Sequence, residues 1–484
     1  MKKMQLIAAL QAILPESAIL SSKESQKPFE CDGLSAYRQL PLLTVLPDTI
    51  EQIQAICKLC NQQQIPLVAR GAGTGLSGGA MPHEEGILLN LAKFNQILSI
   101  DIPNRSVRVQ PGVRNLAISE AVAQYGLYYA PDPSSQIACT IGGNVAENSG
   151  GVHCLKYGLT VHNILELKVV MADGELLTIG SQAYDSAGFD LLALMTGSEG
   201  LLGIIVEVTV KLLPKPERTQ VILAAFDDVA KAGRAVADII AAGIIPAGLE
   251  MMDKLAIQAA EAFVHAGYPL EAEAILLCEI DGNNEEVSEH IMKVHHVLEN
   301  SDPISFATAE SEQQRNLFWA GRKAAFPAVG RLSPDYYCMD GTIPKQHLAA
   351  VLQEIQRLSR HHELAVANVF HAGDGNLHPL ILYDANNAGE LVKAEHFGAD
   401  ILKLCVQAGG SITGEHGVGI EKIDQMCNQF ATDELAQFHS VKAAFDPQGI
   451  LNPGKAVPTL HRCAELGAMH VHHGELPHPE LERF

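Results

Sequence analysis

The stretch RGAGTGLSGG at residues 70–79, which follows the short apolar run PLVA, decides how the first half of this chain is interpreted. Residues 73–78 match G-x-G-x-x-G, but a dinucleotide-binding Rossmann loop needs a helix that begins directly after it. Pro82 and Gly86 disfavour such a helix, and no Gly-Lys-Ser/Thr follows, which excludes a Walker loop. The bare N–H groups of a glycine-rich loop can wrap an anion closely. A sharp turn between strands is the alternative, but five glycines in nine positions favour phosphate binding.

Further clusters of small residues follow along the chain. Residues 131–135 (PDPSS), 139–144 (CTIGGN) and 148–151 (NSGG) combine small side chains with amide and hydroxyl groups and carry almost no charge. Such a tract can lie flat against a planar polar ring system and satisfy its edge atoms. The last cluster, TGSEG at 196–200, precedes a strand-like apolar run. Each cluster alone is ordinary loop chemistry, whereas their order along the chain is far more specific.

This order of clusters resembles the FAD-binding domain of the vanillyl-alcohol oxidase/PCMH flavoprotein family. The resemblance implies a PCMH-type domain of two α+β subdomains, in which the first loop holds the FAD pyrophosphate and the later clusters line the isoalloxazine. Some members attach FAD through a histidine in the first loop. Leu76 and Ser77 stand in that stretch here, so the resemblance implies non-covalent FAD. The implied cofactor-binding residues, with Asn452 from a motif near the C-terminus, are Arg70, Gly71, Ala72, Gly73, Thr74, Gly75, Ser77, Pro131, Asp132, Ser135, Thr140, Gly142, Gly143, Asn144, Asn148, Gly150, Gly151, Glu199, Ile205 and Asn452.

Two histidine-containing motifs stand out in the second half. HAGDGNLH occupies residues 371–378, and GEHGVG occupies 414–419. The glycines of the first motif predict a loop, which can fold two imidazoles onto one ion. A His, His, Glu set suits Zn²⁺ or a similar divalent ion with positions left open for substrate. The chain has 20 histidines, and ordinary packing is the alternative, but the glycine-rich setting favours ligation.

This second half resembles the C-terminal domain of FAD-linked 2-hydroxy-acid dehydrogenases, a group that acts on glycolate, D-lactate or D-2-hydroxyglutarate. The resemblance implies that His371, His378 and Glu415 hold a divalent metal, either Zn or Mn. It implies further that His416 is the general base and that Arg322, in WAGRK, binds the substrate carboxylate. The closing motif DPQGILNPGK at 446–455 contains Asn452, which would reach the flavin.

Three departures from the resemblance concern the substrate. Enzymes for 2-hydroxyglutarate carry Thr, Lys and Asn where this chain has Phe326, Cys338 and Leu380. A distal carboxylate would lose partners, so we expect a small substrate such as glycolate. The fold and function expected are therefore an α+β dehydrogenase that passes hydride to flavin and electrons to an external acceptor, not to NAD.

Several alternatives stay open. D-Lactate or D-2-hydroxyglutarate could be the substrate, with an acceptor or cytochrome as oxidant. The chain could also be a non-catalytic FAD-carrying subunit, or a phosphate-binding module without redox chemistry; the joint presence of both histidine motifs argues against these two classes. The sequence holds no iron–sulfur motif. The resemblance therefore implies a complex with a second flavin-domain subunit and an iron–sulfur subunit, at the inner face of a bacterial membrane.

Composition limits the partners and the location. The 484 residues are 47% hydrophobic and carry a formal charge of −22. Such an acidic chain is poorly suited to nucleic acid or to an anionic membrane, and an anionic substrate would need local positive charge. The ten cysteines are sparse, which favours a reducing cytoplasm. The stretch at 50–63 predicts a helix in which Cys57 and Cys60 are half-buried rather than redox-active.

Changes in composition and in expected secondary structure along the chain predict four segments. Residues 1–38 form a helical extension that begins with an amphipathic helix rather than a signal peptide, and no run is long enough to span a bilayer. Residues 39–217 are rich in strands and glycine, and we expect them to form the FAD-binding domain. In 218–458, strands alternate with helices, which suits an α+β or α/β substrate domain. Residues 459–484 form a histidine-rich tail, expected to be solvated, with metal binding as the weaker alternative.

Overall fold

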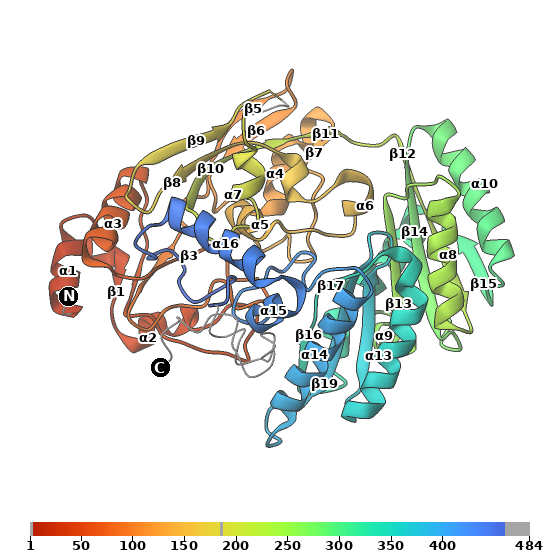
Figure 1. The fold of residues 1–484 in the computed structure, drawn as a ribbon. Coiled ribbons are helices and arrows are strands. Elements are labelled where there is room, and N and C mark those ends of the chain that lie inside the picture. Colours follow the sequence, from red (N-terminus) through yellow and green to blue (C-terminus); the bar gives the residue numbers. More distant parts are fainter. Residues whose placement is uncertain (1–2, 184–186, 460–484) are drawn as a thin grey trace.

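The computed structural model describes residues 3–183 and 187–459. The chain forms two lobes, with residues of the C-terminal end returning to the first lobe (Figure 1). The predicted histidine-rich tail, including His461, His470, His472, His473 and His478, lies outside the described residues apart from its first position, 459.

The first lobe begins with a small sheet in the order β1-β2-β4-β3. Strands β2, β3 and β4 are parallel, and β1 is antiparallel to β2. The predicted helix at 50–63 is α3, and it buries the free thiols of Cys57 and Cys60 completely, rather than by half as expected. Burial raises the pKa of Cys60 to about 12. The elements are α1 (Lys3–Gln11), β1 (Ile19–Leu20), α2 (Lys23–Gln26), β2 (Leu43–Val45), α3 (Ile50–Gln63), β3 (Leu67–Arg70) and β4 (Ile87–Asn90).

A second, antiparallel sheet completes the first lobe in the order β5-β6-β10-β8-β9. Its inward residues, such as Leu167 and Val208, pack against α4 and α5, so the sheet backs the small-residue clusters. The elements are β5 (Ile97–Asp101), β6 (Ser106–Val109), α4 (Asn115–Val122), β7 (Leu127–Tyr128), α5 (Ile141–Glu147), α6 (Cys154–Tyr157), β8 (Ile164–Val170), β9 (Leu176–Gly180), α7 (Leu191–Met195), β10 (Ile204–Lys211) and β11 (Leu213–Pro214), of which β7 and β11 pair with each other.

The second lobe is one sheet in the order β15-β12-β14-β13-β18-β19-β16, with β17 paired to β19. Its strand pairs are all antiparallel, so the lobe is α+β, and the α/β alternative is wrong for it. The strands are β12 (Arg218–Phe226), β13 (Gly248–Asp253), β14 (Ala274–Gly282), β15 (Ser305–Thr308), β16 (Asp335–Cys338), β17 (Gly341–Thr342), β18 (Val366–His371) and β19 (Asn376–Tyr383).

Helices cover both faces of this second sheet, which explains the misleading sequence pattern. Along β12, Ile222 faces one hydrophobic core and Leu223 faces the other, because successive side chains point to opposite faces. Both faces are thus apolar, as in a parallel sheet, although the strands are antiparallel. One core includes α8 (Val229–Ala241), α10 (Asn284–Asn300), α13 (Leu348–His362) and α14 (Glu390–Gln407), and the other includes α9 (Lys254–Val264), α11 (Glu312–Lys323) and α12 (Ala325–Val329).

The chain then returns to the first lobe through α15 (Met426–Gln429) and α16 (Thr432–Phe445) (Figure 1). Leu451 forms a parallel bridge with Leu67, and the Lys442 ammonium donates to the Leu201 carbonyl at 2.7 Å. The α+β class is confirmed, whereas the predicted limits at 38, 217 and 458 stay predictions. Within the described part of the chain, no helix has both the length and the apolar character that a membrane span requires.

Candidate active site

A cavity of about 390 Å³ is lined by residues of both lobes. The predicted cofactor residues in its wall are Arg70, Gly71, Ala72, Gly73, Thr74, Gly75, Ser135, Thr140, Gly142, Gly143, Asn144, Glu199 and Ile205. The predicted catalytic and metal residues in the same wall are Arg322, His371, His378, Glu415 and His416. The two groups of residues therefore line the same cavity, although they are far apart in the sequence.

The glycine loop follows β3 and reaches the cavity without a helix after it, as expected. A Cβ on Gly71 would lie 2.2 Å from Thr140 Oγ1, and one on Gly73, at a φ of +72°, would lie 2.1 Å from Arg70 Nη2. At Gly75 a Cβ would meet no atom within 4 Å. Close packing on one side and open space on the other leave the loop backbone facing the cavity, which is the form of an anion-binding cradle.

Seven predicted cofactor residues do not line the cavity: Ser77, Pro131, Asp132, Asn148, Gly150, Gly151 and Asn452. Asn452 is an example of a supporting contact, since its Nδ2 donates to the carbonyls of Gly79 at 3.0 Å and Glu199 at 2.7 Å.

The other six are also held by the protein. The Ser77 carbonyl accepts from the N–H groups of Ile420 and Glu421, and the Pro131 carbonyl accepts from Asn115 Nδ2. The Asp132 carboxylate contacts His153, and Asn148 ends α5 with a φ of 52°. A Cβ on Gly150 would lie 2.7 Å from Glu415 Oε2, and one on Gly151 would lie 2.5 Å from the Asp132 carbonyl.

The two histidines of the first motif lie on a β-hairpin, so their predicted place in a loop is wrong. His371 ends β18 and His378 lies in β19. His371 lies opposite Asn376 in the hairpin, so these two side chains point to the same face. His378 is two residues further along β19 and shares the face of Asn376, because side chains two apart on a strand point the same way. Both histidines therefore lie on one face of the hairpin. Their ring centroids are 5.1 Å apart. The glycines instead form the tight turn that joins the strands.

Glu415 completes the predicted metal set. Its Oε1 lies 2.9 Å from His378 Nε2 and 3.6 Å from His371 Nε2. One donor atom from each of the three residues lies within 4.8 Å of the others. Two imidazoles and a carboxylate at this spacing fit a divalent cation with open coordination positions.

Glu250, which the sequence analysis missed, lies directly behind this set. Its carboxylate contacts His371 Nδ1 at 2.8 Å and Arg322 Nη2 at 2.6 Å, and both ion-pair partners are buried with it. A carboxylate on Nδ1 leaves Nε2 of His371 free to face an ion. The available signal was an acidic residue in the middle of the otherwise uncharged run GLEMM at 248–252.

His416 lies beside the metal set on a loop that wraps around Asp340, a second residue missed from the sequence. The Asp340 carboxylate is fully buried and accepts from Thr413 Oγ1 at 2.6 Å and His416 N at 2.8 Å. Burial opposes the charge of Asp340, but His416 and Lys422 lower its pKa to about 2. Asp340 therefore fixes the loop as a buried anion.

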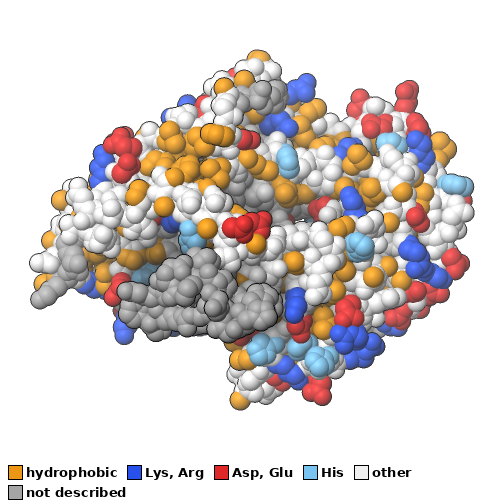
Figure 2. Space-filling view, in the orientation of Figure 1, with side chains coloured by type: hydrophobic (Ala, Val, Ile, Leu, Met, Phe, Trp, Pro, Cys, Tyr) orange, Lys and Arg blue, Asp and Glu red, His pale blue; other side chains and the backbone are white. Residues whose placement is uncertain are grey.

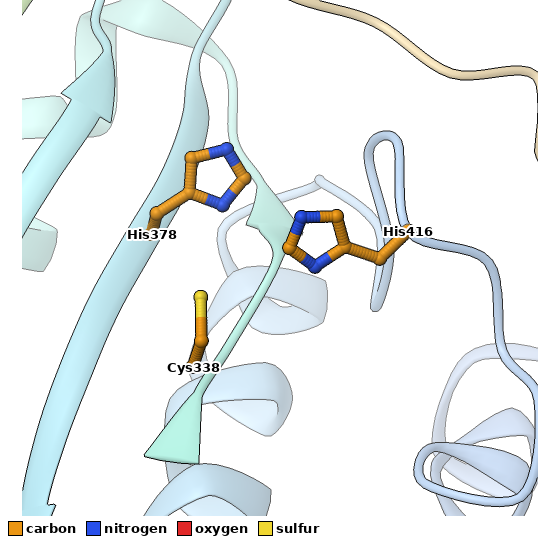
Figure 3. A group of neighbouring side chains, drawn as sticks. All are labelled: Cys338, His378 and His416. Carbon is orange, nitrogen blue, oxygen red and sulfur yellow. The ribbon is translucent and has the colours of Figure 1, made fainter. Parts of the chain in front are cut away.

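The His416 ring stacks on His378, with centroids 5.0 Å apart (Figure 3). Burial lowers the pKa of His416 to about 4, against the raising effect of Asp340. His416 is therefore neutral near pH 7, the form that can accept a proton. The Cys338 thiol points toward these two rings, and its sulfur lies within 4.8 Å of a ring nitrogen of each (Figure 3). The thiol donates to the Met339 carbonyl at 3.4 Å. Burial raises the pKa of Cys338 well above its usual range, so it stays a neutral thiol.

Arg322 enters the cavity wall from the last turn of α11. Its side chain is 2% exposed, and its Nε has no hydrogen-bond partner among the described residues. Lys323 and Phe326 line the same wall, and the Phe326 ring lies edge-on to His378 with centroids 6.3 Å apart. A buried, incompletely bonded guanidinium beside the metal set can bind a carboxylate, and the aromatic ring restricts the space next to it.

Comparisons with known proteins agree with this geometry. The family model described as FAD binding domain matches residues 41–180, and that described as FAD linked oxidases, C-terminal domain matches 215–456. The glycolate oxidase subunit GlcD of Escherichia coli strain K12 is 65% identical over 99% of this chain and 96% of its own. A D-lactate dehydrogenase of Anaerostipes hadrus is 33% identical over 93% and 97% of the two chains.

The fold is shared with more distant proteins. The crystal structure of p-cresol methylhydroxylase with substrate bound superposes with a TM-score of 0.80 over 95% of this chain and 97% of that one, at 17% identity. The predicted PCMH-type architecture, followed by an oxidase C-terminal domain, is thereby confirmed.

Proposed function

The chain belongs to the FAD-linked oxidases, and on that premise we propose that it oxidises glycolate, or a similarly small D-2-hydroxy acid, to the 2-oxo acid. It is an FAD-dependent oxidoreductase that acts on hydroxy acids. The observation that carries the choice of substrate class is the cavity shared by the two lobes, whose wall contains the glycine loop together with Arg322, His416 and the His371, His378 and Glu415 set. Electrons leave the flavin for an external acceptor rather than for NAD.

The residues of the first lobe fit FAD. A glycine loop with open backbone N–H groups suits the pyrophosphate, and the uncharged tract at 139–144 suits a flat ring. When bound, FAD supplies the hydride acceptor. The cavity wall includes no histidine from the glycine loop, in keeping with non-covalent attachment.

A divalent metal, Zn or Mn, is the second group that the site fits. His371, His378 and Glu415 would hold it, with Glu250 orienting His371 from behind. When bound, such an ion polarises substrate oxygens and lowers the pKa of a hydroxyl group. The fit rests on the donor set itself, which is buried, convergent and composed of imidazole and carboxylate groups.

Residues of the chain itself bind the substrate, accept its proton and position the base. Arg322 binds the substrate carboxylate through charge-assisted hydrogen bonds, which are strong in a buried site. Neutral His416 takes the hydroxyl proton at one of its ring nitrogens. The Asp340 carboxylate holds the His416 backbone N–H and so fixes where that ring stands.

D-Lactate is the second candidate substrate, because a relative with that activity in its name is 33% identical. Phe326 favours glycolate, since its ring occupies part of the wall beside His378 and leaves less room for a substituent on C2. A panel of glycolate, D-lactate and D-2-hydroxyglutarate with a dye acceptor separates these substrates. A non-catalytic FAD-carrying subunit would reduce its flavin with none of them.

His371→Ala provides the central test of the proposal. We expect turnover of glycolate to be lost while FAD stays bound, because His371 belongs to the metal set and not to the glycine loop. The measurements are dye-linked activity, metal content and flavin absorbance of the purified protein. Full activity in a metal-free His371→Ala protein would contradict the metal role.

The reduced flavin must pass its electrons to another protein or molecule, which bears on the partners of this chain. The related proteins are named as subunits of glycolate oxidase. We infer that this chain works with a second flavin-domain subunit and an iron–sulfur subunit, and that they bring it to the cytoplasmic face of the inner membrane. Purification from cells, scored for co-purifying subunits, flavin and iron, tests this assembly.

A further inference from the structure

His153 joins the two lobes through both of its ring nitrogens. Nδ1 lies 2.8 Å from Asp132 Oδ2 in the first lobe, and Nε2 lies 3.0 Å from Glu279 Oε1 on β14 in the second. A carboxylate accepts but does not donate, so each contact needs an N–H on the imidazole. His153 is therefore held as an imidazolium between two carboxylates, outside the cavity wall.

The second carboxylate connects His153 to the helix that carries Arg322. Glu279 Oε2 accepts from Trp319 Nε1 at 2.6 Å, and the Trp319 ring lies 6.4 Å from the His153 ring. Trp319 and Arg322 are three residues apart on α11, which places them on one side of that helix. The position of the Trp319 side chain therefore fixes the last turn of α11.

The first carboxylate connects His153 to the flavin side of the cavity. Asp132 directly precedes Pro133, Ser134 and Ser135, which line the cavity. Packing around the bridge is tight: a Cβ on Gly248 would lie 2.9 Å from Val152 Cγ1 and 3.4 Å from Trp319 Cη2. The two walls thus cannot approach or separate without disturbing this contact.

We propose that His153 is a positioning residue that sets the distance between the flavin wall at 133–135 and Arg322, through Asp132 on one side and Glu279 and Trp319 on the other. It touches neither the cavity nor the metal set, and it acts on substrate binding by way of α11. The proposal rests on the proposed function, in which Arg322 binds the substrate carboxylate.

A neighbouring contact offers a matched control. Lys156 and Tyr157 of α6 bind the Asp281 carboxylate at 2.6 Å and 2.7 Å, two residues along β14 from Glu279. This contact joins the same two lobes but has no hydrogen bond to α11. Lys156→Met therefore weakens the interface without disturbing the Trp319 anchor, whereas His153→Gln disturbs it.

The test measures anaerobic flavin reduction in the FAD-loaded protein by rapid mixing with glycolate. For His153→Gln we expect the apparent Kd for glycolate to rise about tenfold, and the limiting reduction rate to change less than threefold, as for a lost positioning contact. Trp319→Phe, which keeps the ring but removes the N–H, should raise the Kd in the same way. Lys156→Met should leave the Kd within twofold of wild type. An unchanged Kd in His153→Gln, or an equal rise in Lys156→Met, overturns the proposal.

Trp319 is the chain's single tryptophan, which gives a readout that needs no substrate. Its emission should change in His153→Gln and stay as in wild type in Lys156→Met, because only the first variant alters the charge beside the indole. If glycolate fails to reduce wild-type flavin, the proposed function fails, and the emission still decides on the bridge. Should His153→Gln not fold, Glu279→Gln carries the emission comparison, and Glu279→Gln and Trp319→Phe carry the comparison of Kd values. Emission from Trp319 that is identical in wild type and in His153→Gln or Glu279→Gln overturns the proposal.

Discussion

Glu250 is the residue on which the second half of the site depends most. It is 1% exposed and contacts both Arg322 and His371, so one buried anion neutralises the guanidinium proposed to bind substrate and orients a histidine proposed to bind metal. Removing one partner of a buried ion pair leaves the other charge uncompensated, which is more costly than losing an exposed pair.

We therefore expect Glu250→Gln to lower the free energy of unfolding by about 3–5 kcal/mol. The affinity for Zn²⁺ or Mn²⁺ should fall about 10–100-fold, as when a carboxylate behind a ligating histidine is lost. Urea unfolding and metal titration measure the two effects. Glu273→Gln is the control, because Glu273 pairs with Lys254 at an exposed position and should change neither quantity appreciably. Equal behaviour of the two variants would contradict this role for Glu250.

At the scale of elements, the β18–β19 hairpin brings together His371 and His378, the two histidines proposed as metal ligands. Gly375 in its turn has a φ of +85°, and a Cβ there would lie 2.1 Å from the Ile343 carbonyl oxygen. We expect Gly375→Ala to cost more than the roughly 1–2 kcal/mol of a left-handed residue, because the backbone must also shift. The pairing of β18 with β19 should shift and move His371 relative to His378, so the metal content of the purified protein should fall.

Gly389 provides the control for that prediction. Its φ is +87°, close to that of Gly375, but a Cβ there would meet no atom within 4 Å. Gly389→Ala should therefore cost only the strain and retain the metal. Thermal unfolding and metal analysis of both variants separate the strain from the clash. Full metal content in Gly375→Ala would show that the turn does not set the ligand geometry.

Elements were more predictable from the sequence than their partners. The stretch at 50–63 coincides with α3, because Thr49 caps it and its apolar residues recur at helical spacing. The hairpin was mistaken for a loop because glycines mark a tight turn and an open loop alike. Glu250 and Asp340 were missed because their importance comes from side chains on other elements, far away in the sequence.

At the scale of the whole molecule, the charge of −22 poses the problem of an anionic substrate. Acidic and basic side chains are intermixed over the face of the second lobe seen in Figure 2. Positive charge is nevertheless present in the cavity wall, at Arg322 and Lys323. Because Glu250 already neutralises part of the Arg322 charge, the exposed Lys323 and the predicted metal must supply much of the local attraction for a carboxylate.

The contact between the lobes should make stability depend on pH. Although burial opposes its charge, Asp132 and Glu279 raise the pKa of His153 well above the ordinary 6.5. A raised pKa means that the contact stabilises the folded protein fully below about pH 6.5 and loses this effect as the pH rises through the folded pKa. The groups facing the imidazolium are those two carboxylates and the neutral Trp319 indole.

We therefore expect the difference in Tm between wild type and His153→Gln to be largest near pH 6 and to shrink towards the alkaline range, where wild-type His153 is neutral as well. Differential scanning calorimetry across this range measures it, with Lys156→Met as control. Lys156→Met leaves the His153 ring and both of its carboxylate partners in place, so its Tm difference should not show the decline with pH that is expected of His153→Gln. A His153→Gln difference that is flat or grows with pH would mean that no imidazolium links the lobes.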